Sequence, residues 1–175
     1  MARLAMHAIS LCTMALISGC ARQPSLSEPE VPATLRAPQN QTLVLEALAT
    51  GVQIYECSQK ADSAYEWTFK APEATLASRT GQNIGKHYAG PTWESPDGSA
   101  VVGELKARDP GPDVSAIPWL LLSGKTSTGS GTFTTIKSIQ RLDTKGGVAP
   151  GQPCTDKNLK QIVRVPYTAT YYFYR

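Results

Sequence analysis

Short runs in which apolar and polar residues alternate follow one another along the chain after residue 40. The clearest run is 64–70, in which every second residue is aromatic (Tyr65, Trp67 and Phe69) and the residues between them are polar or charged. A period of two is typical of a β-strand that buries one face. The pattern therefore predicts a strand here.

Four further runs have strand-like composition without such clean alternation. They are 42–48, 52–57, 132–142 and the C-terminal run 165–175. Their β-branched and aromatic residues favour extended structure. The last run stays aromatic up to its end, so we expect the chain to end inside a sheet. The apolar segment 116–124 predicts a buried strand that contains Trp119.

Gly, Pro and Asp cluster between these runs, at 95–98, 108–113 and 144–153. Such clusters are typical of turns, and Asp97 in the sequence SPDG is interpreted as a turn residue rather than a catalytic acid. No segment has the pattern of an amphipathic helix of three turns, and 72–80 is the nearest candidate for one short helical turn. Many short strands separated by turns predict an all-β fold, mainly an antiparallel sandwich or barrel, with at most short helices.

The N-terminus has the composition of an export signal. Residues 1–19 place one basic residue before an apolar run that is too short to span a membrane. Small residues then precede Cys20, which resembles the bacterial lipobox, although a cleaved signal with a chance cysteine is the alternative. Ala21 stands where an aspartate usually retains such proteins at the inner membrane. We therefore expect a protein attached through lipid on Cys20, at the outer membrane and facing the periplasm.

Residues 20–38 are rich in Pro, Ser and charge and show no apolar period. This composition predicts a lipidated N-terminus and flexible linker that buries no core. The remaining residues, 39–175, are of the right length for one β-rich domain.

Charge argues against one class of partner. The chain has 17 Lys and Arg against 14 Asp and Glu, without a basic stripe. Nucleic-acid binding is therefore not expected.

Two cysteines remain once Cys20 is assigned to lipid and Cys12 to the signal. Cys57 and Cys154 form an even pair in an oxidising compartment, which predicts a disulfide. The alternative, a reactive thiol, lacks a Cys-x-x-Cys motif or a histidine near either cysteine in the sequence. A disulfide would connect the early strands to the C-terminal part of the domain.

His87 is the only histidine outside the signal. Three-histidine zinc sites and HExxH metalloprotease sites cannot be built from it, and we expect no metal and no cofactor. His87 lies with Tyr88, Trp93 and Glu94 in the segment 85–94, between Gly and Pro residues that permit close approach of the backbone.

We interpret these four residues as a candidate surface for a small molecule or glycan, with Trp93 exposed beside a concavity. Two alternatives remain open. Trp93 and His87 belong to the core in the first, and in the second His87 acts with a carboxylate in an envelope hydrolase or isomerase. A purely structural subunit would instead expose an apolar patch, for which 171–175 is the candidate.

Six blocks occur in an order that resembles a known family. They are 49–57, 85–94, 97–104, 116–122, 139–154 and 165–175. This set is similar to the domain of unknown function 3455, a family of exported proteins of bacteria and fungi. The resemblance implies no activity, but it does imply two cysteines that match Cys57 and Cys154.

Overall fold

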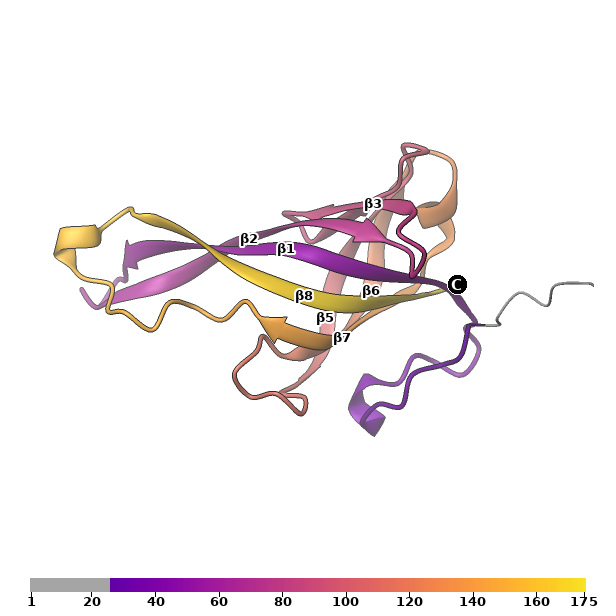
Figure 1. The fold of residues 1–175 in the computed structure, drawn as a ribbon, viewed down its shortest axis with the longest axis horizontal. Helices are drawn as coiled ribbons and strands as arrows, with labels where there is room; N and C mark the ends of the chain where they lie inside the picture. Colours follow the sequence, from indigo (N-terminus) through magenta and orange to yellow (C-terminus); the bar gives the residue numbers. More distant parts are fainter. Residues whose placement is uncertain (1–25) are drawn as a thin grey trace, which may run out of the picture.

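The fold is an eight-stranded antiparallel barrel, seen in a computed structural model that describes residues 26–175 (Figure 1). Each strand pairs with the next, and β1 pairs with β8 to close the barrel. The strands are β1 (Leu43–Gln59), β2 (Tyr65–Ala77), β3 (Asn83–Tyr88), β4 (Thr92–Glu94), β5 (Ala100–Asp109), β6 (Trp119–Thr128), β7 (Ser138–Gly146) and β8 (Ile162–Tyr174). Three short 3-10 helices complete it: η1 (Ala33–Leu35), η2 (Thr132–Thr135) and η3 (Asp156–Asn158).

The all-β prediction is confirmed. The expected signal peptide and the lipid-bearing Cys20 lie outside the described residues. In the part of the chain that the structure describes, no helix has the length and apolar character needed to cross a membrane.

An arm of three strands extends beyond the barrel (Figure 1). Residues 65–73 of β2 and 162–166 of β8 pair with β1 alone, because β3 and β7 end before they reach them. The Cys57–Cys154 disulfide joins the arm to the segment that precedes β8, so the predicted pairing is confirmed. Trp67 Nε1 adds a hydrogen bond of 2.8 Å to the carbonyl of Gln152. The disulfide and this bond fix the segment against the arm.

The core occupies one part of the inside of the barrel. Inward residues alternate with outward ones along each strand, as in β1, where Ala47 and Ala49 are buried and Leu48 is exposed. On β8, Tyr171 and Phe173 point inward and pack against Trp93 of β4.

The outer face of β6, β7 and β8 carries a second apolar cluster. Tyr172 and Tyr174 belong to it and are buried, so the expectation that 171–175 forms an exposed apolar patch is wrong. Leu35 of η1 covers this cluster and is fully buried. Its carbonyl accepts a hydrogen bond of 2.7 Å from Gln140 Nε2.

The N-terminal segment therefore corrects the linker prediction at its C-terminal end. Residues 31–37 form a strap across the outer face of the barrel, because Val31, Leu35 and Ala37 pack on the apolar cluster beneath them. A Pro- and Ser-rich composition concealed these few apolar contacts.

Two other local predictions are also corrected. The nearest candidate for a helical turn was 72–80, but residues 72–77 belong to β2, where Ala74 and Leu76 face the core between β1 and β3. The strand expected over 132–142 begins only at Ser138, because 132–135 form η2. Asp97 holds η2 in place by accepting a hydrogen bond of 2.9 Å from the backbone N–H of Thr132.

Candidate ligand-binding cavity

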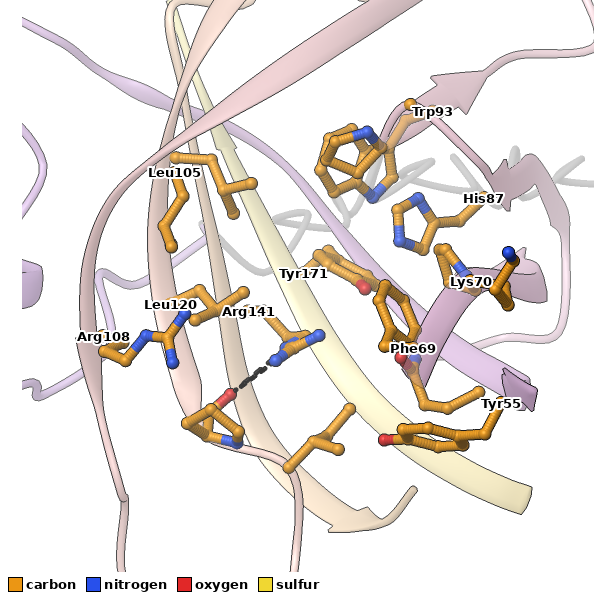
Figure 2. Close-up of a pocket in the computed structure, with 17 residues that line it drawn as sticks. Tyr55, Phe69, Lys70, His87, Trp93, Leu105, Arg108, Leu120, Arg141 and Tyr171 are labelled. Atoms are coloured by element: carbon orange, nitrogen blue, oxygen red, sulfur yellow. Dashed lines mark hydrogen bonds between the residues drawn. The ribbon is translucent and has the colours of Figure 1, made fainter. Parts of the chain in front are cut away.

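A cavity of about 620 Å³ opens into the barrel at the base of the arm. Its size lies in the range that ligand pockets usually occupy. The walls are mainly apolar and aromatic, and Figure 2 shows the labelled side chains converging on it from opposite sides. Phe69 of β2 and Leu105 of β5 also line it, and both remain almost half exposed (49% and 44%).

Two of the four predicted site residues lie on the cavity wall. His87 of β3 and Trp93 of β4 are cross-strand partners, and both side chains point into the barrel. Their rings stack with centroids 4.3 Å apart and an interplanar angle of 15°. Tyr171 of β8 meets the His87 ring edge-on at 5.1 Å. Gly103 makes room for the indole, since a Cβ there would lie 2.8 Å from Trp93 Cζ3.

The expectation that Trp93 is exposed is wrong. Trp93 is 1% exposed and His87 3%, because the short hairpin formed by β3 and β4 closes the barrel wall and turns both rings inward. His87 and Trp93 are therefore buried, as one of the alternatives had it, and they also line the cavity.

The protonation state of His87 follows from its surroundings. Nδ1 lies 2.8 Å from the carbonyl oxygen of Thr92. A carbonyl can only accept, so Nδ1 carries the proton and Nε2 is left as an acceptor. Burial and, to a lesser extent, the charge of Arg141 lower the pKa of His87 to about 3, against the opposing effect of the hydrogen bond to Thr92. The imidazole is neutral at physiological pH.

The other two predicted residues lie on the outer face of the same hairpin. Tyr88 donates a hydrogen bond of 2.7 Å to Glu94 Oε2, and Lys86 pairs with Glu94 Oε1 at 3.1 Å. These bonds, first that from Tyr88, lower the pKa of Glu94. Strand alternation thus separates Tyr88 and Glu94 from His87 and Trp93, and no single surface contains all four.

Arg141 is the residue that sequence reasoning missed. It lies on β7 opposite Leu120 of β6 and Tyr171 of β8, and all three side chains line the cavity. Its guanidinium donates two hydrogen bonds to the carbonyl of Pro118, from Nε at 3.2 Å and from Nη2 at 2.8 Å. The alternation of strand residues could have indicated it. Arg141 lies two residues after the buried Ile139, so both side chains are on the same face of β7.

The cavity lining is basic. Lys70, Arg108 and Arg141 line it, and the lining includes no Asp or Glu among residues 26–175. Lys70 is partly neutralised by Glu56, whose Oε2 lies 3.5 Å from Lys70 Nζ. Neither arginine forms an ion pair within the described part of the chain.

Several polar atoms around the cavity are buried without a hydrogen-bond partner among these residues. They are Gln53 Nε2, Trp93 Nε1 and the Tyr171 hydroxyl. Buried polar groups normally have a partner in protein or ordered water. For metals, the described residues contain no group of three or more His, Cys, Asp or Glu side chains that could hold an ion.

Comparison with known proteins gives one match. The family model described as "Protein of unknown function (DUF3455)" covers residues 38–175, which is the whole barrel. No curated protein and no solved structure matches the chain.

Proposed function

The chain belongs to the family described as "Protein of unknown function (DUF3455)", whose description names no activity, so we propose a function from the geometry. The barrel is a binding module that takes a small molecule into its cavity. The cavity at the base of the arm carries this proposal. A closed eight-stranded barrel has an interior wide enough either to be filled by side chains or to hold one small ligand. Here part of the interior is left open, and its walls are rings and aliphatic side chains.

The lining favours a ligand with an apolar body. Burial of apolar surface contributes about 25 cal/mol per Å² and does not depend on direction. Ile117, Leu120 and Leu122 supply such surface inside, and Phe69 and Leu105 continue it to the mouth. A glycan presents many hydroxyl groups that each need a partner. The mainly apolar walls therefore favour a small apolar molecule over a glycan.

The alternative of a hydrolase or isomerase receives no support from this geometry. It requires His87 to act with a carboxylate, whereas Glu94 lies on the opposite face of the hairpin and is bonded to Tyr88. A histidine whose pKa lies near 3 is also a weak base at neutral pH.

We also propose the location that the N-terminal sequence favours. Lipid on Cys20 would anchor the chain to the outer membrane, with the barrel in the periplasm. More than one acyl chain gives stable anchoring. The strap would then bring the tether to the outer face of β6, β7 and β8.

The test is a thermal-shift screen of the purified protein, carrying Cys20→Ser to keep it without lipid. The panel contains aliphatic and aromatic acids, alcohols, phenolics and oligosaccharides. A ligand at a hundred times its dissociation constant stabilises the fold by about 2.7 kcal/mol, which raises the melting temperature by several degrees.

Two tryptophan variants form a matched pair for this screen. Leu120→Trp fills the cavity from β6, while Leu48→Trp adds the same ring on the outer face of β1, where Leu48 is exposed. A shift that Leu48→Trp retains and Leu120→Trp loses supports the proposal. Equal shifts in both variants would place the ligand elsewhere, and no shift across the panel would contradict a small-molecule function.

A further inference from the structure

Resting on the proposed binding function, we propose that the ligand is an amphipathic organic anion, whose apolar body occupies the barrel and whose acidic group pairs with the guanidinium of Arg141. Three features of the cavity point to such a ligand: the orientation of Arg141, the charges of the lining and the apolar surface around Arg141.

The two bonds to Pro118 use only one edge of the Arg141 guanidinium. Both bonds to the Pro118 carbonyl come from one side of the guanidinium, through Nε and Nη2. Arginine has five N–H donors in a fixed planar fork, so the two hydrogens of Nη1 and the second hydrogen of Nη2 are not used by the bonds to Pro118. Two such donors side by side match the two oxygens of a carboxylate. Figure 2 shows the guanidinium among the lining side chains, held by the bond to Pro118.

The surrounding charges favour an anion. A cation that lines an apolar cavity is costly unless a negative group pairs with it. The described residues offer Arg141 no such group, and Arg108 at the same cavity adds positive charge. Burial raises the pKa values of Tyr55 and Tyr171, and the positive charge of Arg141 opposes this rise at both tyrosines.

The position of Arg141 requires the ligand to be amphipathic. Its strand neighbours Leu120 and Tyr171 present apolar surface to the cavity on either side of it. An acid held by Arg141 would therefore have its body against these side chains. A small hydrophilic anion such as inorganic phosphate would leave them uncovered.

A purely structural role for Arg141 is the competing explanation. The two bonds to Pro118 connect β7 to the chain that enters β6, and they need no ligand. The two explanations differ in a measurable way. A structural role affects every ligand alike, whereas a role in recognition separates acids from neutral molecules of the same shape.

The first experiment needs no substitution. Isothermal titration calorimetry at pH 7.5 compares decanoate with 1-decanol, and 1-naphthylacetate with 2-(1-naphthyl)ethanol, on the wild-type protein. A hydrogen-bonded charged group contributes enough for us to expect the acid of each pair to bind roughly 10- to 100-fold more tightly. Alcohols that bind as tightly as the acids would overturn the anion inference and leave the proposed binding function intact. Binding of neither member of either pair would overturn both.

The second experiment compares Arg141→Gln with Arg164→Gln. Arg164 lies on the arm, paired with Glu73 at 2.8 Å, so its loss removes the same charge outside the cavity. We expect Arg141→Gln to weaken the acids by roughly 10- to 100-fold and the alcohols little, and Arg164→Gln to change neither. If Arg141→Gln weakens acid and alcohol equally, or neither, Arg141 is structural. Arg141→Lys, which keeps the charge but not the fork, provides a second folded comparison and should recover part of the preference for acids.

Discussion

The buried neutral His87 predicts a specific loss of stability in mild acid. In the folded barrel the imidazole stacks on Trp93, meets Tyr171 edge-on and lies in the field of Arg141, and no carboxylate among residues 26–175 lines the cavity beside it. Burial lowers its pKa from the ordinary 6.5 to about 3. The unfolded chain therefore takes up a proton at His87 at a pH where the folded chain does not.

The sign and size of this loss of stability follow from the linkage between proton binding and folding. A pKa that is lower in the folded state gives stability that is fully present above pH 6.5 and is lost as the pH falls toward 3. Each pH unit in this window contributes about 1.4 kcal/mol. Between pH 7 and pH 5 the free energy of unfolding should fall by about 2 kcal/mol through His87 alone. For a domain of this size that is a large share of the total.

The assay is urea unfolding, followed by circular dichroism at pH 7 and pH 5, of the wild-type protein and of His87→Phe. Phenylalanine keeps a ring against Trp93 but cannot titrate. The comparison ends at pH 5 because most carboxyl groups titrate below it. We expect the wild-type protein to lose about 2 kcal/mol more than the variant between the two pH values. Equal losses in both proteins would refute the assignment of a buried, neutral His87.

Three further predictions concern the scaffold. Gly103→Ala should destabilise the barrel by about 1–3 kcal/mol in chemical denaturation, because its Cβ would overlap Trp93; an unchanged midpoint would show that the indole can move aside. Leu35→Ala should cost about 2–5 kcal/mol, since Leu35 belongs to the strap and is fully buried against the barrel, and a cost below about 0.5 kcal/mol would mean that the strap is not bound in solution. The double variant Cys57→Ser, Cys154→Ser should lower the free energy of unfolding by up to about 4.5 kcal/mol, because the disulfide closes a loop of 97 positions. As a control, the double variant should be as stable as the reduced wild-type protein. A double variant as stable as the oxidised wild-type protein would contradict this contribution.

The sequence predicted strands best where alternation and local composition agree. Tyr65, Trp67 and Phe69 alternate with polar residues, and they lie in β2 as expected. Alternation did not predict the exposure of Phe69, because that depends on β2 leaving the barrel wall where the arm begins. The pairing of Cys57 with Cys154 was predictable because only two cysteines remained.

The site was less predictable, because barrel closure decides which face of a strand is inside. The segment 85–94 was singled out for its ring side chains, yet its residues alternate between two faces of a hairpin, so His87 and Trp93 are separated from Tyr88 and Glu94. Arg141 reaches the cavity through pairing with β6 and β8, which lie some 20–30 positions away along the chain. The local sequence around Arg141 does not indicate how β7 pairs with β6 and β8.

The claim that the cavity binds a ligand is tested most directly by NMR, through the indole N–H signals of the three tryptophans during titration with 1-naphthylacetate. Trp93 lines the cavity, whereas the Trp67 indole is bonded to Gln152 on the arm and Trp119 packs on the outer face, so the latter two are internal controls. We predict a saturable shift of the Trp93 signal, with the Trp67 and Trp119 signals unchanged. A ligand that binds by calorimetry but leaves the Trp93 signal in place would contradict binding inside the barrel.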